Sequence, residues 1–220
     1  MPILAAYNEI ALKSRFVRST LERRLAAQIE YVLRRAGYPE AKSRRQFGRI
    51  IVEGAPPEAA EVVARVFGVV HAIPAEGTGI ELDEVVALAV KAAGDTLKQG
   101  STFAVRPRVV GEHPYGSREV AVKARAAINE ANKTRAVKVN LTAPDVTVNI
   151  EVRDTDSFVY SRLLDGVGGL PYGSQGRAVS LFSGGIDSPV ATWLTMKRGV
   201  EVLPLFMDQT PYVGESYLRR

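Results

Sequence analysis

A short polar loop near the end of the chain reads Ser183-Gly184-Gly185-Ile186-Asp187-Ser188-Pro189. The apolar segment 178–182 precedes it, a helical pattern runs from Pro189 to Arg198, and residues 200–206 are apolar again. This order predicts a strand, a loop, a helix and a second strand. Such an arrangement is the βαβ unit of a parallel sheet, which we expect to be covered on both faces.

The residue types in this loop suit an anionic ligand. Gly184 and Gly185 allow a sharp turn and let backbone amides approach a ligand without an intervening side chain. We expect Ser188 to be the N-cap of the helix and Pro189 its first residue. The helix N-terminus and the loop amides would then face one point, where the hydroxyls of Ser183 and Ser188 can also donate to phosphate oxygens.

Asp187 would repel a bare phosphate, so we expect it near a Mg²⁺ that bridges phosphates, or as an acceptor that orients the loop. The loop lacks the lysine of a Walker A motif and the G-x-G-x-x-G spacing of a dinucleotide-binding loop. The alternative without a ligand is an ordinary glycine-rich turn with a capping serine. Because the chain has no cysteine and only His71 and His113, we expect no metal site formed by protein side chains alone.

Composition narrows the class of protein. Hydrophobic residues make up 46% and charged residues 24%, as in ordinary globular proteins. No apolar stretch approaches the ~20 residues that span a bilayer, and the N-terminus does not read as a signal peptide. We therefore expect a cytoplasmic protein without a membrane partner. The net charge of +5 and the pI of about 9.5 favour a polyanionic partner.

The front of the chain has a ferredoxin-like order of elements. The patterns predict a strand at 3–9, a helix from Val17 to Gly37, extended segments at 41–46 and 49–53, a helix at 56–67 and a strand at 69–75. A second small α/β domain follows. Its expected elements are helices at 82–97 and 117–131, a strand at 102–109 and a hairpin of 146–152 with 158–160.

The predicted organisation is α/β throughout. It comprises residues 1–77 as a first domain, 78–165 as a second, 166–177 as a glycine-rich linker and 178–220 as the start of a doubly wound parallel-sheet domain. About 45 residues remain after the linker, fewer than the ~100 usual for a domain. We therefore expect the third domain to be incomplete and the chain to be a fragment that does not turn over by itself.

Several motifs together resemble one family. The SGGxDS loop resembles the PP-loop of ATP pyrophosphatases. Gly168–Gly173 and Met196–Glu201 beside it, Glu9–Lys13 near the N-terminus and Leu141–Asp145 before the hairpin resemble the corresponding parts of the ThiI family of tRNA-thiolating enzymes. The likeness touches all three regions and covers nearly the whole chain.

The resemblance implies a ferredoxin-like N-terminal domain and a THUMP domain that together hold the acceptor end of tRNA. A PP-loop domain would use ATP and Mg²⁺ to adenylate O4 of the uridine at position 8, after which sulfur from a persulfide displaces AMP and forms 4-thiouridine. A cysteine desulfurase is the implied kind of sulfur donor, some members also supply sulfur for the thiazole of thiamine, and a homodimer is left open. The catalytic cysteine of the family lies further along the domain than these residues reach.

Two sets of site residues follow. The residues that the resemblance places around ATP are Leu181, Phe182, Ser183, Gly184, Gly185, Ile186, Asp187, Ser188, Phe206 and Met207. The candidate RNA contacts on and beside the THUMP-like helix are Arg106, Arg108, Lys123, Arg125, Lys133 and Arg135, with Arg18, Arg23 and Arg34 as weaker candidates. As phosphate contacts they would position RNA without reading its sequence. The alternative for each is a solvated basic surface.

Two other functions remain open. The two front domains could form a non-catalytic RNA-binding module, in which case tRNA binding would persist without ATP binding. The loop could also belong to a PP-loop synthetase of small molecules, which would cleave ATP weakly and independently of tRNA. The second alternative leaves the basic front half unexplained.

Overall fold

The computed structural model describes residues 1–183 and 185–208. Gly184 of the expected ATP loop and the last part of the expected 178–220 domain, residues 209–220, lie outside the described residues. The described chain divides into two compact units. We call residues 1–3 with 73–163 the inserted unit, and residues 4–72 with the described residues from 164 onward the split unit.

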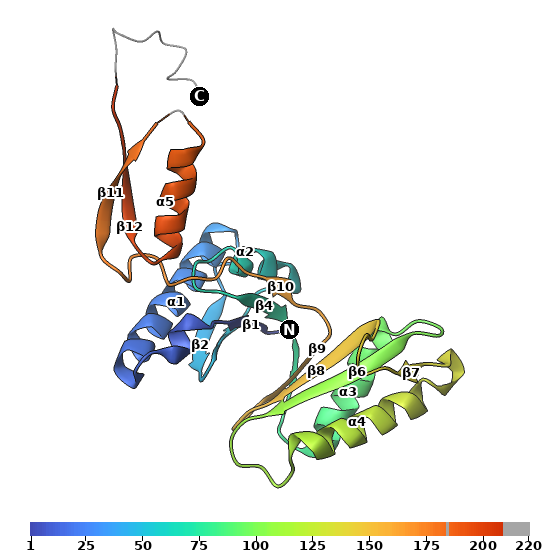
Figure 1. Cartoon of the computed structure of the whole chain (residues 1–220). Helices are drawn as coiled ribbons and strands as arrows, with labels where there is room; N and C mark the ends of the chain where they lie inside the picture. Colours follow the sequence, from blue (N-terminus) through green and yellow to red (C-terminus); the bar gives the residue numbers. More distant parts are fainter. Residues whose placement is uncertain (184, 209–220) are drawn as a thin grey trace. The chain divides into compact units, whose positions relative to one another are not determined.

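The split unit contains the ferredoxin-like order that the sequence predicts (Figure 1). Its sheet has the order β10-β4-β1-β3-β2, in which β2 and β3 form an antiparallel hairpin and β10 pairs antiparallel with β4 at the edge. The elements are β1 (Ile3–Ala6), η1 (Glu9–Leu12), α1 (Arg15–Arg35), β2 (Lys42–Gln46), β3 (Arg49–Glu53), η2 (Pro57–Ala59), α2 (Ala60–Ala64), β4 (His71–Pro74) and β10 (Leu164–Asp165).

Helix α1 supplies much of the core beneath this sheet. Its buried stripe has the predicted helical spacing and consists of Leu21, Leu25, Ile29 and Leu33, joined by Ala26. Val17, at which the sequence predicts the helix to begin, is 43% exposed, because the buried stripe begins one turn later, at Leu21. Helix α1 ends before Gly37, whose φ of +95° suits a residue without Cβ. Helix α2 ends at Ala64, short of the predicted 67.

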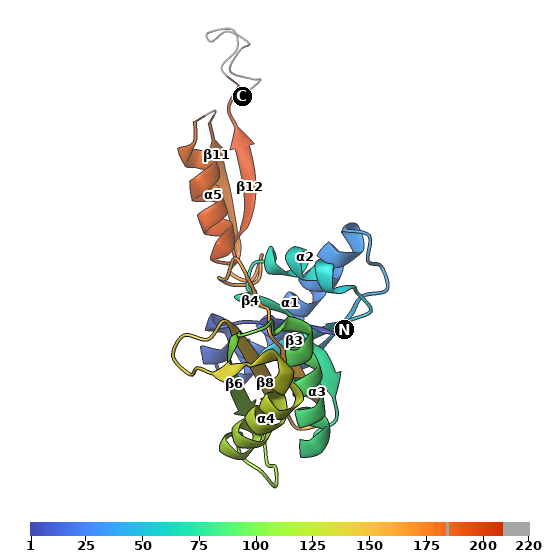
Figure 2. The same cartoon turned by 90° about the vertical axis from the view of Figure 1, so that its right-hand side faces the viewer.

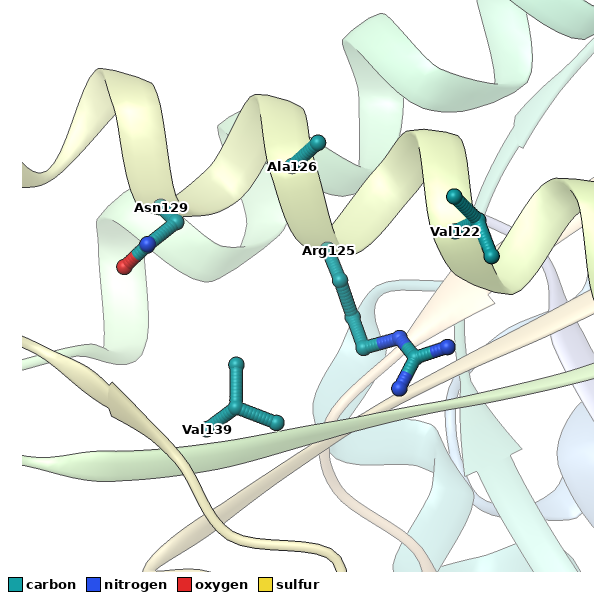
Figure 3. Close-up of a pocket in the computed structure, with 5 residues that line it drawn as sticks. All are labelled: Val122, Arg125, Ala126, Asn129 and Val139. Atoms are coloured by element: carbon teal, nitrogen blue, oxygen red, sulfur yellow. The ribbon is translucent and has the colours of Figure 1, made fainter.

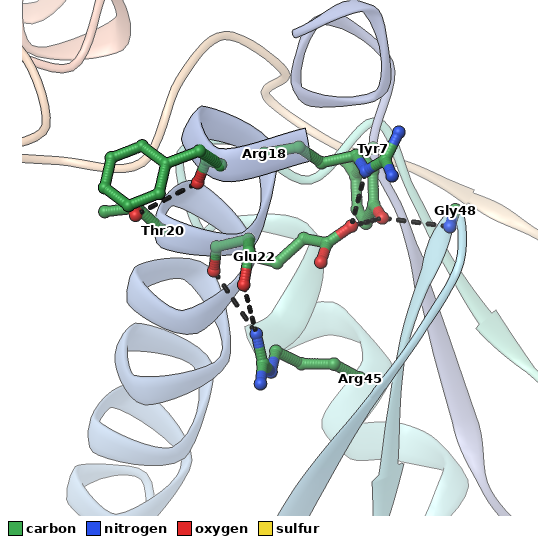
Figure 4. Close-up of polar contacts among 8 residues, drawn as sticks. Tyr7, Arg18, Thr20, Glu22, Arg45 and Gly48 are labelled. Atoms are coloured by element: carbon green, nitrogen blue, oxygen red, sulfur yellow. Dashed lines mark hydrogen bonds and ion pairs between the residues drawn. The ribbon is translucent and has the colours of Figure 1, made fainter. Parts of the chain in front are cut away.

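The buried Tyr7 forms hydrogen bonds with both the β2–β3 turn and α1 (Figure 4). The hydroxyl of Tyr7 donates a hydrogen bond to the Glu22 carboxylate and accepts one from the Gly48 amide at 2.9 Å. Arg18 lies 3.8 Å from the same carboxylate. Burial and the neighbouring Glu22 raise the pKa of Tyr7 above its ordinary value, so the hydroxyl stays a donor at neutral pH.

The inserted unit is a two-layer α/β fold (Figures 1 and 2). Its sheet has the order β5-β9-β8-β6-β7, with β6 parallel to β8 and the predicted antiparallel β8–β9 hairpin present. The elements are β5 (Glu76–Thr78), α3 (Leu82–Thr96), β6 (Thr102–Val109), α4 (Ser117–Ala131), η3 (Lys133–Arg135), β7 (Lys138–Val139), β8 (Val146–Val152) and β9 (Ser157–Tyr160).

Helices α3 and α4 pack on each other and on this sheet, and they enclose a core around Phe103, Val120, Ile128 and Ile150. Glu151 and Arg153 of this unit form a buried ion pair. Arg153 Nη2 is 2.7 Å from Glu151 Oε2, both side chains are 4% exposed, and Tyr160 Oη donates to Glu151 Oε1 at 3.1 Å. The carboxylate is therefore compensated from two sides, as a buried charge requires.

The C-terminal segment forms the predicted βαβ unit from β11 (Arg177–Phe182), α5 (Asp187–Lys197) and β12 (Glu201–Phe206). Helix α5 packs beside the two strands (Figure 2). Among the described residues α5 covers one face of this sheet, and the expected cover on both faces stays a prediction. The face away from α5 carries side chains that are roughly half exposed or more, namely Val179, Leu181, Leu203 and Leu205.

Within the described residues, none of the helices is both long and apolar enough to cross a membrane.

Candidate functional site

The described loop residues 183, 185 and 186 lie where two parallel strands end together. Strands β11 and β12 run in register, so that Leu181 pairs with Leu205 and Phe182 with Phe206. The loop follows Phe182 directly, and Met207 follows Phe206. The carboxyl ends of adjacent parallel strands are the usual place for a nucleotide in this class of sheet. The described members of the expected ATP set therefore gather at one sheet edge.

Two serines fold the loop back on itself. Ser188 Oγ accepts the Ser183 amide at 2.9 Å, donates to the Ser183 carbonyl at 3.2 Å and lies 3.1 Å from Ser183 Oγ. The expected N-cap role of Ser188 is wrong, because α5 begins at Asp187 and the N-cap is Ile186. Ser188 therefore lies in the first turn, where its hydroxyl closes the loop and does not cap the helix.

The geometry of the loop fits a phosphate. The first-turn amides of α5 lack intrahelical acceptors and carry the positive end of the helix dipole. A Cβ built on Gly185 would meet, among described atoms, Ser183 Oγ at 3.6 Å, so the glycine leaves room above the backbone. Asp187 and Ile186 are exposed, and Phe206 and Met207 are 41% and 64% exposed. This edge of the described segment is open to a ligand.

The described residues contain no group of three His, Asp or Glu side chains that could hold a metal ion. For Mg²⁺ the fit therefore depends on a shared donor set, in which Asp187 would supply one carboxylate and the phosphates of a bound nucleotide would supply the other oxygens.

The inserted unit carries the expected RNA contacts on three elements. Arg106 and Arg108 lie on β6, Lys123 and Arg125 on α4, and Lys133 and Arg135 on η3. Several also make contacts within the unit. Lys123 pairs with Glu119 at 3.4 Å and Lys133 with Glu130 at 2.6 Å, while Arg106 donates to the Leu141 carbonyl at 3.3 Å and Arg125 to the Ala121 carbonyl at 2.9 Å.

Arg135 has a structural contact that distinguishes it from the other five. Its Nη1 donates to the carbonyls of Gly94 at 2.7 Å and Leu97 at 3.0 Å, at the C-terminal end of α3. A cation there satisfies carbonyls that lack intrahelical donors and complements the helix dipole. In the split unit, Arg18 lies over the ring of Phe47, while Arg23 and Arg34 are exposed on α1.

An open groove of about 270 Å³ lies between α4 and β7 (Figure 3). Its lining residues are Val122, Arg125, Ala126, Asn129 and Val139. Figure 3 shows Arg125 and Val139 extending toward the space between the helix and the strands. Sequence reasoning identified Arg125 and missed the others. The available signal was Val122, an apolar residue on the polar side of α4 that is 53% exposed.

Three family models match successive parts of the chain. The "ThiI ferredoxin-like domain" matches residues 2–72, the "THUMP domain" matches residues 80–162, and "Thiamine biosynthesis protein (ThiI)" matches residues 173–220. The expected ATP loop lies in the third match, and the groove beside α4 lies in the second.

Known proteins resemble the chain over nearly its whole length. It is 38% identical to a "Probable tRNA sulfurtransferase" of Methanosarcina acetivorans and 40% identical to one of Thermoanaerobacter pseudethanolicus, over 99% and 97% of this chain and 53% and 55% of those proteins. The chain thus spans about half the length of the curated relatives it matches.

Two solved structures share the fold. The crystal structure of PH1313 from Pyrococcus horikoshii has a TM-score of 0.84 and 32% identity, covering 99% of this chain and 70% of that chain. The crystal structure of a 4-thiouridine synthetase–RNA complex with bound ATP has a TM-score of 0.79 and 28% identity, covering 99% of this chain and 55% of that chain. The motifs, the domain matches and these relatives agree, and the chain belongs to the ThiI family.

Proposed function

We propose that this chain is the tRNA-binding and ATP-binding part of a tRNA 4-thiouridine synthetase. The observation that carries the proposal is the in-register pairing of Phe182 with Phe206, which puts the PP-loop at the shared carboxyl edge of two parallel strands. The relative solved with both RNA and ATP supports the assignment of these two ligands. The proposed domains are the N-terminal ferredoxin-like domain (1–77), the THUMP domain (78–165) and the first part of the PP-loop domain (178–220). Residues 166–177 connect the last two.

The proposed chemistry is an adenylation. Uridine O4 would attack the α-phosphorus of ATP and pyrophosphate would leave. The outer sulfur of a persulfide would then displace AMP from C4, and a second thiol outside these residues would break the S–S bond, forming a disulfide and releasing 4-thiouridine. The first-turn amides of α5 and the hydroxyls of Ser183 and Ser188 would bind and orient the triphosphate. Bound Mg²⁺ would neutralise charge on the phosphates, with Asp187 as its protein ligand. The other ATP contacts in this proposal are Leu181, Phe182, Gly184, Gly185, Ile186, Phe206 and Met207.

The remaining assignments concern the whole protein. Because these 220 residues contain no cysteine, the sulfur must be brought by a donor outside them, for which a cysteine desulfurase is the proposed class. Sulfur transfer for thiamine thiazole, a cytoplasmic location and a homodimer belong to the same proposal.

We predict that this chain binds tRNA through its 3′ single-stranded end. Removing that end should weaken binding about tenfold, because unstacked nucleotides offer base faces and edges that a duplex hides. Fluorescence anisotropy over a salt series measures this, and the affinity for intact tRNA should fall steeply as salt rises. Equal affinity for intact and truncated tRNA would indicate that a basic surface binds RNA without recognising the 3′ end.

Asp187→Ala is expected to weaken MgATP binding about tenfold, because a nucleotide-bound Mg²⁺ loses a charged ligand. Isothermal titration with MgATP measures the change, and tRNA affinity should stay unchanged. Wild-type chain that binds tRNA but no ATP would favour the non-catalytic RNA-binding module. ATP cleavage that is weak and indifferent to tRNA would favour the small-molecule synthetase.

A further inference from the structure

The segment between β10 and β11 is bound to the ferredoxin-like fold along its first part. The Gly166 amide donates to the Val70 carbonyl at 2.7 Å, the Gly168 amide donates to the Val69 carbonyl at 2.7 Å, and the Gly68 amide donates to the Gly168 carbonyl at 2.8 Å. These are hydrogen bonds between backbone groups, like those between neighbouring β-strands. The start of the segment is therefore part of the fold and not a free tether.

The same segment is bound to the C-terminal βαβ unit along its later part. The Leu170 amide donates to the Lys197 carbonyl at 3.0 Å, at the C-terminal end of α5. The Gln175 amide donates to the Gly199 carbonyl at 2.9 Å, and Tyr172 Oη accepts the Val202 amide at 3.3 Å. The segment thus satisfies backbone groups where α5 turns into β12.

Helix α1 holds the middle of the segment. Arg24 Nη1 donates to the Gly173 carbonyl at 2.7 Å, and Gln28 Nε2 donates to the Tyr172 carbonyl at 2.6 Å. Tyr172 therefore bonds α1 through its carbonyl and β12 through its hydroxyl. Tyr172 thereby connects the ferredoxin-like fold to β12, the strand that ends at Phe206.

Two side-chain contacts join α5 to the ferredoxin-like fold directly. Arg198 makes a two-pronged ion pair with Glu9, with Nη1–Oε1 at 2.8 Å and Nη2–Oε2 at 2.9 Å. The hydrogen bonds from Arg198 hold the pKa of Glu9 below its ordinary value, so the pair is charged at neutral pH. Trp193 of α5 meets the ring of Phe67 edge-on at 5.6 Å between centroids.

We propose that the segment 166–176 between β10 and β11, together with the Glu9–Arg198 pair, fixes the C-terminal end of α5 on the ferredoxin-like fold. Glu9, Arg24 and Gly169 are then positioning residues for the ATP loop at the other end of that helix. A helix is stiff along its axis, so a held C-terminus determines where its N-terminal amides point. The ferredoxin-like fold then serves as the base of the nucleotide site. The ATP part of this inference rests on the proposed function, whereas the mechanical part does not.

Two neighbouring glycines provide a matched pair of variants. Gly168 and Gly169 have φ values of +67° and +82°, so alanine strains the backbone at both. A Cβ on Gly169 would lie 2.1 Å from the Lys197 carbonyl oxygen, which is backbone and must move. A Cβ on Gly168 meets no described atom within 4 Å. Gly168→Ala therefore introduces backbone strain alone, whereas Gly169→Ala introduces backbone strain and also disrupts the contact with α5. The difference between the two variants measures the effect of that contact.

The absence of cysteine allows two spin labels to be placed without background. Lys42→Cys on β2 and Leu194→Cys on α5 are both exposed positions outside the contacts described above. Pulsed electron paramagnetic resonance of the labelled chain should give one narrow distance distribution in the parent and in Gly168→Ala. In Gly169→Ala the distribution should broaden, and MgATP affinity should fall about tenfold against Gly168→Ala, as expected when binding groups lose their support.

The ion pair is tested by charge exchange. Glu9→Arg and Arg198→Glu should each broaden the distribution, and the double variant should restore a narrow one, which a merely destabilising change would not do. A distribution in Gly169→Ala as narrow as in Gly168→Ala, or no recovery in the double variant, overturns the coupling. If the parent binds no MgATP while the distances behave as expected, the proposed function fails and the coupling stands.

Discussion

Glu151→Ala should destabilise the inserted unit by about 3–5 kcal/mol, because it removes the carboxylate that lies 2.7 Å from the buried Arg153 guanidinium. Both side chains are 4% exposed, so water cannot replace the lost partner. A loss of this size is a large fraction of the ~5–15 kcal/mol that holds a typical domain together. Urea unfolding followed by hydrogen exchange of the β8 and β9 amides measures it in this unit specifically.

Two controls separate the buried pair from charge in general. Glu130→Ala removes an ion pair with Lys133 whose side chains are about 70% exposed, and it should cost less than about 1 kcal/mol. Replacing both Glu151 and Arg153 with methionine and leucine should recover part of the stability, because both charges of the buried pair are then removed together. A Glu151→Ala loss no larger than that of Glu130→Ala would show that water reaches the pair.

The double variant Arg106→Glu with Arg125→Glu should weaken tRNA binding about 100-fold, roughly tenfold for each reversed phosphate contact. Arg125 lines the groove beside α4, and Arg106 projects from β6 of the same unit. The plot of log affinity against log salt should also lose about two units of slope, one for each cation removed. Filter binding between low and moderate salt gives both quantities.

The matched control for this variant is Arg23→Glu with Arg34→Glu on α1. It makes the same change in net charge at two exposed positions, which the sequence marks as weaker candidates. A general attraction between a basic protein and RNA would lower affinity equally in both double variants. A clearly larger effect of the Arg106 and Arg125 pair is expected, and equal losses would remove the case for a site in the inserted unit.

The local patterns of the sequence were sufficient for the element order. Periodicity located α3 and β6 nearly to the residue, and Gly37 ended α1 where its positive φ is needed. The loop 183–188 was identified as a phosphate loop because its glycines, serines and flanking apolar segments are contiguous in the chain. Such features depend on neighbours a few residues apart, and a sequence contains these directly.

The finer geometry of the loop depended on contacts across it. Ser188 suits an N-cap by type and position, yet its hydroxyl bonds to Ser183 and the helix begins at Asp187. Asp, Ser and Pro are each acceptable at several first-turn positions, so small energy differences choose among them.

The roles of the basic residues also needed tertiary structure. Arg106, Arg125 and Arg135 are alike in sequence, but Arg135 caps the carbonyls of α3 about 40 residues earlier in the chain. The sequence by itself determined the family and the α/β class, and it predicted the location of the proposed nucleotide loop, because these depend on contiguous motifs. Only the tertiary structure decided that Glu9 meets Arg198 and that a glycine-rich segment is bonded on both sides, because such pairings join residues that are distant along the chain and leave no periodic trace in it.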